Sequence, residues 1–250
     1  MYYYISEAPR SRDDQRALEH VRGLLTSLGI AGEFVSTSPA RTVEELAEIG
    51  AAKKYSTIVA LGSDDLINRV AALLAGTSYV FGAIPLQHPR ALELVSGITS
   101  LEEAAEALKY RRVRPTAITR IEPNKFLLTE ARIQLARATP LRLTVDDCLV
   151  TGDCTDIRFA GNGRIVVNNR YATGGRVTQF FNWFRGAEPQ SDRFTSHFSV
   201  QRAVIELDGT YPAYVGREVF AKTPLALTVL PGVLKMITRR DRLAASQTAH

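Results

Sequence analysis

The residues best suited to chemistry lie in one short segment, Gly62–Asn68, which holds a glycine, a hydroxyl group, two carboxylates and an amide. An apolar run typical of a strand buried on both faces, Ser56–Leu61, precedes it, and a helical pattern, Leu66–Leu74, follows it. Many α/β proteins bind ligands beyond the carboxyl end of a strand, where a helix N-terminus attracts anions. The segment is therefore a candidate binding turn, although Ser63 or Asp64 could simply cap the helix.

The first hundred residues alternate between strand and helix patterns. Helix starts are indicated where a Ser or Thr is followed three residues later by an acid, at Ser11, Thr42 and Ser100. The β-prone runs between them are Tyr2–Ile5, Glu33–Ser36, Ser56–Leu61 and Tyr79–Leu86. We therefore expect residues 1–110 to form a three-layer α/β domain, with a mostly parallel sheet between two layers of helices.

Beyond Tyr110 the helical signal nearly disappears, and short alternating segments follow one another. The strands that we expect are Ala117–Ile121, Lys125–Ile133, Leu141–Leu149, Asp156–Ala160, Arg164–Asn169, Phe194–Leu207, Glu218–Lys222, Leu225–Leu230 and Val233–Thr238. They predict an antiparallel β-sandwich domain over residues 111–250, joined to the first domain at Arg111–Pro115.

The composition is that of an ordinary soluble globular protein, with 45% apolar and 23% charged residues among 250. The chain has no run of 18 apolar residues, which a membrane span would need, and its first residues lack the features of a secretory signal. Its two cysteines, Cys148 and Cys154, are too few for a disulfide framework, and their spacing fits no zinc pattern. We expect a cytoplasmic protein with free thiols and no dedicated metal site.

The net charge of +5 is unevenly distributed, with −4 in residues 1–110 and +9 in residues 111–250. A basic second half favours an anionic partner, and we expect a membrane surface rather than nucleic acid. The alternative is that scattered arginines only solvate a β-rich surface. An aromatic group, Phe180–Phe184, could contact acyl chains, form a dimer face or belong to the core.

The binding turn and the change from α/β to β patterns resemble the diacylglycerol- and sphingosine-type lipid kinases, whose fold is shared with NAD kinases. The nucleotide turn of that family reads Gly-Gly-Asp-Gly-Thr, then an apolar residue, Asn and Glu. Gly62, Asp64 and Asn68 match it, whereas Ser63 and Asp65 replace glycines, Leu66 replaces the threonine and Arg69 the glutamate. Asp65 adds a carboxylate where phosphate would lie, so it would repel ATP unless Mg²⁺ lies between them.

The other two family motifs are also incomplete. Pro-Leu-Gly-Thr-Gly-Asn-Asp aligns with residues 85–91, where only Pro85 and Leu86 are kept. His88 or Arg90 could contact phosphate, or both could be merely solvated at a helix start. Asp-Gly-Glu aligns with residues 215–217, where only Gly216 is kept, and Glu218 follows one position late. The resemblance implies that the acidic residue there helps to activate the acceptor hydroxyl group.

The resemblance implies an ATP- and Mg²⁺-dependent kinase that phosphorylates a lipid-like hydroxyl group. Its expected nucleotide-binding residues are Gly62, Ser63, Asp64, Asp65, Asn68, Pro85, Leu86 and His88, and its candidate catalytic residue is Glu218. The last strand would return to the first domain, and the protein could lie peripherally at the membrane. Two alternatives stay open: a nucleotide- or ligand-binding pseudokinase, and a non-enzymatic protein that binds anionic surfaces through the β domain. Loss of binding on substituting Arg239, Arg240 and Arg242 would support the second alternative.

Overall fold

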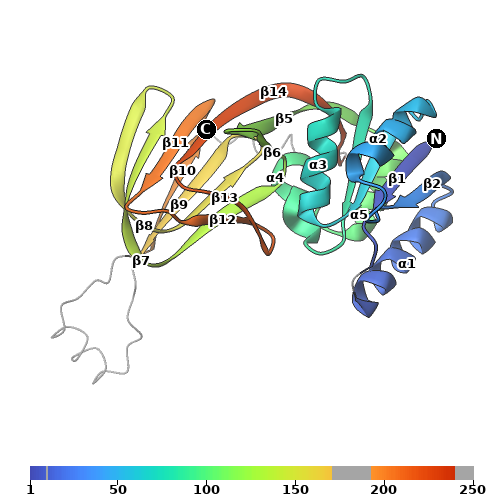
Figure 1. Cartoon of the computed structure of the whole chain (residues 1–250), viewed down its shortest axis with the longest axis horizontal. Coiled ribbons are helices and arrows are strands. Elements are labelled where there is room, and N and C mark those ends of the chain that lie inside the picture. Colours follow the sequence, from blue (N-terminus) through green and yellow to red (C-terminus); the bar gives the residue numbers. More distant parts are fainter. Residues whose placement is uncertain (10, 171–192, 240–250) are drawn as a thin grey trace.

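The computed structural model describes residues 1–9, 11–170 and 193–239. The aromatic group around Trp183 and the tail arginines Arg240 and Arg242 lie outside the described residues. Helices cluster at one end of the molecule and antiparallel strands at the other, with one long strand running along both (Figure 1).

The N-terminal part is a parallel sheet flanked by helices, as expected. Its strands are β1 (Tyr2–Ser6), β2 (Gly32–Ser36), β3 (Thr57–Gly62) and β4 (Val80–Pro85), in the spatial order β4-β3-β1-β2. Its helices are α1 (Arg12–Ser27), α2 (Val43–Ala52), α3 (Asp64–Leu74), α4 (Glu93–Ser96), α5 (Leu101–Tyr110) and the 3₁₀ helix η1 (Pro89–Leu92). Helix α1 contacts α5, and α2 contacts α3 (Figure 1). Every residue of β3 and β4 is buried, as their apolar runs indicated.

The predicted helix starts are confirmed by hydrogen bonds. The hydroxyl groups of Ser11 and Ser100 accept the backbone N–H three residues ahead. Thr42 and Glu45 form a reciprocal capping box. These bonds satisfy backbone donors that the first helical turn leaves unpaired, which explains why the local sequence alone predicts them.

The C-terminal part is antiparallel, also as expected. Its strands are β5 (Val113–Ile121), β6 (Lys125–Leu127), β7 (Glu130–Val145), β8 (Cys148–Ala160), β9 (Arg164–Arg170), β10 (Arg193–Ser199), β11 (Arg202–Leu207), β12 (Pro212–Val215), β13 (Glu218–Lys222) and β14 (Leu225–Ile237). The expected strand Phe194–Leu207 is in fact two strands, and the last two expected strands are one continuous strand, β14. Strand β12 was not expected.

Strand β14 joins the two parts into one hydrogen-bonded sheet. It pairs antiparallel with β5 and β11, and its last residues pair in parallel with β4, through Lys235 with Val80 and Met236 with Phe81. Two apolar cores lie on this sheet, one among the helices and one among the antiparallel strands. The division at Arg111–Pro115 stays a prediction. No helix in the described part of the chain is long and apolar enough to cross a membrane.

Candidate functional site

The first two predicted motifs lie side by side at the carboxyl edge of the parallel sheet. Gly62 at the end of β3 pairs with Pro85 at the end of β4, and the Leu86 N–H donates to the Gly62 carbonyl oxygen at 2.9 Å. A Cβ atom on Gly62 would lie 3.0 Å from Leu66 Cδ2 and 3.4 Å from Glu7 Oε2. Glycine therefore lets the ends of β1 and β3 and the start of α3 approach closely.

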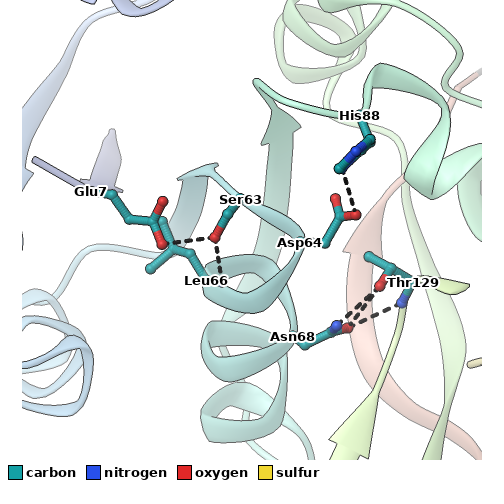
Figure 2. A network of polar contacts seen from close by, with 7 residues as sticks. All are labelled: Glu7, Ser63, Asp64, Leu66, Asn68, His88 and Thr129. Carbon is teal, nitrogen blue, oxygen red and sulfur yellow. Dashed lines mark hydrogen bonds and ion pairs between the residues drawn. The ribbon is translucent and has the colours of Figure 1, made fainter. Parts of the chain in front are cut away.

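Ser63 caps α3, as the simpler reading of the turn predicted. Its hydroxyl group accepts the Leu66 N–H at 3.2 Å and donates to Glu7 Oε1 at 2.7 Å (Figure 2). Glu7 comes from the end of β1 and was not among the predicted site residues. Glu7 could have been found from the sequence because it directly follows the β-strand that ends at Ser6, just as Ser63 directly follows β3.

Asp64 and His88 form the central contact of the site. The Asp64 side chain is 7% exposed, and its Oδ2 lies 3.1 Å from Nδ1 of His88, which is 42% exposed (Figure 2). This distance is within the range of an ion pair, and Nδ1 of His88 has no hydrogen-bond partner among the described residues. Burial raises the pKa of the Asp64 carboxyl group, and His88 lowers it by less. Asp64 Oδ1 is buried and has no hydrogen-bond partner among the described residues.

The third predicted motif reaches the same place from the C-terminal part. Gly216, in the turn between β12 and β13, has a φ angle of +58°, which favours glycine. A Cβ atom there would lie 3.0 Å from His88 Cε1 and 3.5 Å from Asp64 Oδ2. The positions of all three family motifs therefore meet at the Asp64–His88 pair. Val215, where the family has Asp, is buried and apolar.

Asn68 contacts the residues just before β7 rather than the Asp64–His88 pair. Its Oδ1 accepts the backbone N–H groups of Leu128 at 2.8 Å and Thr129 at 3.1 Å, and its Nδ2 donates to Thr129 Oγ1 at 3.0 Å (Figure 2). The side chain is buried and fastens α3 to the start of β7. Its amide is thus engaged within the protein rather than directed at the Asp64–His88 pair.

Two cavities share the Asp64–His88 pair and Gly216 as a wall. One, of about 490 Å³, we name the acidic cavity because its lining includes the carboxylates of Glu7, Asp14, Asp64, Asp65 and Glu218. The other, of about 560 Å³, we name the arginine cavity because its lining includes Arg90, Arg132, Arg158 and Arg164. The predicted residues Asp65 and Glu218 therefore face the acidic cavity, whereas His88 borders both.

The two cysteines lie away from this pair. Cys148 is exposed at the start of β8, and Cys154 is buried in the second core, where burial raises the pKa of its thiol to about 12. Asp146 lies in the turn between β7 and β8, with a φ angle of +48°. Among the described residues, no three His, Cys, Asp or Glu side chains cluster closely enough to bind a metal by themselves.

Comparison with known proteins agrees with this convergence. Residues 7–121 match the family model of the diacylglycerol kinase catalytic domain. A crystal structure described as a proposed diacylglycerol kinase from Bacillus anthracis str. Sterne is similar at 15% identity and a TM-score of 0.65, over 98% of both chains. Another, described as a diacylglycerol kinase of the same strain, is 16% identical with a TM-score of 0.63, over 95% of this chain and 97% of that one.

Comparison with curated protein sequences gave no match. The resemblance inferred from the sequence motifs is nevertheless confirmed by the family model and by the fold. The match over residues 7–121 is to the diacylglycerol kinase catalytic domain family, and the chain has the fold of the diacylglycerol-type lipid kinases.

Proposed function

We propose that this protein transfers a phosphoryl group from ATP to the hydroxyl group of a lipid-like acceptor. The observation that supports this most directly is the contact between Asp64 and His88 against Gly216, because it joins all three motif positions between two cavities. Phosphoryl transfer depends chiefly on positioning and charge neutralisation, so incomplete motifs do not by themselves exclude it.

In this proposal, His88 replaces the acid that the family has at the position of Val215. Asp64 orients the imidazole ring through Nδ1, and Nε2 has no hydrogen-bond partner among the described residues. Nε2 takes the proton of the acceptor hydroxyl group as its oxygen bonds to the γ-phosphorus and the bond to the β-phosphate oxygen breaks. Glu218 at the start of β13 is the alternative proton acceptor, because it also faces the acidic cavity.

The donor set near the acidic cavity fits a magnesium ion that arrives with the nucleotide. Mg²⁺ commonly binds one or two carboxylates together with substrate phosphates. Asp65 and Asp64, whose Oδ1 has no hydrogen-bond partner within the described part of the chain, are the residues that would hold it. When bound, the ion would offset the negative charge of the phosphates, which the carboxylates of this cavity would otherwise repel.

Calorimetric titration with ATP, with and without Mg²⁺, tests the nucleotide part of the proposal. The wild type should bind ATP only with Mg²⁺, and Asp64→Asn should lose that binding. Arg142→Gln is a control, because Arg142 is exposed and its one ion-pair partner among the described residues is Glu206, at 3.7 Å. Transfer of labelled phosphate to lipid acceptors then tests catalysis. The absence of binding at millimolar ATP in the wild type would contradict the proposal.

A second candidate function is that of a ligand-binding pseudokinase. It is favoured because two polar side chains of the turn, Ser63 and Asn68, form hydrogen bonds within the protein. The Ser63 hydroxyl group bonds Glu7, and the Asn68 amide bonds Thr129, so neither is available to a phosphate in this conformation. Mg²⁺-dependent ATP binding without transfer to any acceptor would support this candidate. A lipid acceptor would bring the protein to a membrane surface under either candidate, and a homodimer stays a prediction.

A further inference from the structure

The arginine cavity is lined by four arginines, two of which lie on neighbouring strands and two of which have no ion-pair partner among the described residues. Arg132 and Arg158 lie directly opposite each other on β7 and β8. Like charges at opposed positions of neighbouring strands destabilise a sheet. Both arginines share one carboxylate, which offsets only one of their two charges: Arg132 pairs with Asp156 through Nε, and Arg158 Nε lies 3.6 Å from Asp156 Oδ2. Asn168 Nδ2 donates to the same oxygen at 2.8 Å.

The other two arginines of the cavity lack such a partner. Arg90 on η1 and Arg164 on β9 are exposed, and neither guanidinium forms an ion pair with another described residue. The cavity also holds Glu93, Glu130 and His197. Burial raises the pKa of the Glu130 carboxyl group, Asp156 raises it further, and the two opposed arginines lower it by less.

Arg90 comes from the N-terminal part of the chain, and the other three arginines come from the C-terminal part. All four line the same cavity as His88. Arginine presents a planar fork of N–H donors that matches the oxygens of a phosphate, and such charge-assisted bonds are among the stronger ones in proteins. A neutral acceptor such as a diacylglycerol would leave this charge unused. A phosphate group in the cavity would relieve the repulsion between Arg132 and Arg158.

We propose that the arginine cavity binds a phosphate group of the acceptor, so that the hydroxyl group to be phosphorylated belongs to a phosphate-bearing lipid rather than to a neutral one. This inference rests on the proposed function for its reaction, but not for the binding itself. The acidic cavity would then take the magnesium nucleotide, and the Asp64–His88 pair would stand between donor and acceptor.

Binding measured without nucleotide tests the inference separately from catalysis. We would titrate the full chain calorimetrically with three probes: dihexanoyl phosphatidylglycerol, dihexanoylglycerol and glycerol 3-phosphate. The cavity variant combines Arg90→Gln with Arg164→Gln, since these side chains form no ion pair with described residues. The matched control combines Arg120→Gln with Arg142→Gln, which removes the same charge from exposed positions that do not line the cavity.

We expect the wild type to bind the phosphatidylglycerol, and the cavity variant to bind it about tenfold more weakly or worse. The control should stay within about twofold, because surface charges act weakly at a distance in salt. Weak binding of glycerol 3-phosphate beside tight binding of the phospholipid would identify a lipid headgroup as the source of the phosphate; equal binding of both would identify a soluble phosphate ester and overturn the lipid acceptor.

Equal loss in the cavity and control variants, or equal binding of dihexanoylglycerol, would overturn the inference. So would a cavity variant that weakens ATP binding and leaves phospholipid binding unchanged, because the arginines would then serve the nucleotide. If ATP does not bind at all while the phospholipid still binds through Arg90 and Arg164, the proposed kinase function fails and the binding of phosphate by the arginine cavity stands.

Discussion

The buried amide of Asn68 ties helix α3 to Thr129 at the start of β7. The amide oxygen accepts two backbone N–H groups, and the amide nitrogen donates to the Thr129 hydroxyl group. The helix that begins at Asp64 and the sheet that carries Arg132 are thereby fixed relative to each other. The shape of the arginine cavity, which both Asp64 and Arg132 line, depends on this contact.

Replacing Asn68 by Ala should lower the free energy of unfolding by about 2–4 kcal/mol, because the buried N–H groups of Leu128 and Thr129 lose their acceptor. Urea unfolding followed by circular dichroism measures this. Arg69→Ala, on the next position of α3, removes only an exposed ion pair with Glu44 and should cost less than about 1 kcal/mol. Full stability together with lost ATP binding would instead make Asn68 a nucleotide ligand.

Replacing Gly216 by Ala should disturb the Asp64–His88 pair. The φ angle of +58° strains any other residue, and the new Cβ atom would lie 3.0 Å from His88 Cε1. Gly76→Ala is the control, because Gly76 has a φ angle of +76° but nothing within 4 Å of the added atom. Both variants should lose about 1–2 kcal/mol of stability. Only Gly216→Ala should also lose about tenfold or more in transfer rate, and equal rates would contradict the role given to this turn.

Where the sequence predicts the fold, the signals are local. The cap at Thr42 and the apolar run of β3 depend on neighbours within a few residues. The break between β10 and β11 lacks such a signal, because no glycine or proline marks Val200–Gln201. It is held instead by Asp146 Oδ1, which accepts the N–H groups of Gln201 at 3.0 Å and Arg202 at 2.8 Å. A contact across more than fifty residues cannot be read from local periodicity.

The same distinction applies to the site. The ligand turn after β3 follows from a strand, a cap and a helix, so Ser63 and Asp64 could be singled out. Glu7 and Thr129 matter only because the fold brings them to α3 from distant positions. The opposed arginines on β7 and β8 likewise depend on the register of the two strands, which alternation alone does not set.

The pH dependence of stability should report the buried carboxyl group of Asp64. Its pKa is raised by burial, so the folded chain keeps this proton to higher pH than the unfolded chain, whose carboxyl group has its ordinary value of 3.8. The contribution of Asp64 to stability is therefore most favourable below that value and falls as pH rises through the folded pKa. Unfolding measured from pH 4 to 8 should show Asp64→Asn gaining stability relative to wild type as pH rises.

Asp65→Asn is the matched control for that series, because Asp65 lies on the same turn but is only half-buried. It should follow the wild-type pH dependence. Parallel curves for the wild type and Asp64→Asn would mean that the carboxyl group of Asp64 ionises equally easily in the folded and unfolded chains. That result would contradict a pKa raised by burial.

Replacing His88 by Ala should lower the transfer rate by about 10²–10⁴-fold, because the acceptor hydroxyl group loses the base that takes its proton. ATP affinity, measured separately by calorimetry, should change little. Added imidazole should restore part of the rate, since the cavity left beside Asp64 can admit a free base. His20→Ala, at an exposed histidine of α1 that lines neither cavity, should keep both quantities near the wild-type values. An unchanged rate with weakened ATP binding would instead assign His88 to the nucleotide phosphates, and Glu218 would then be the residue to replace next.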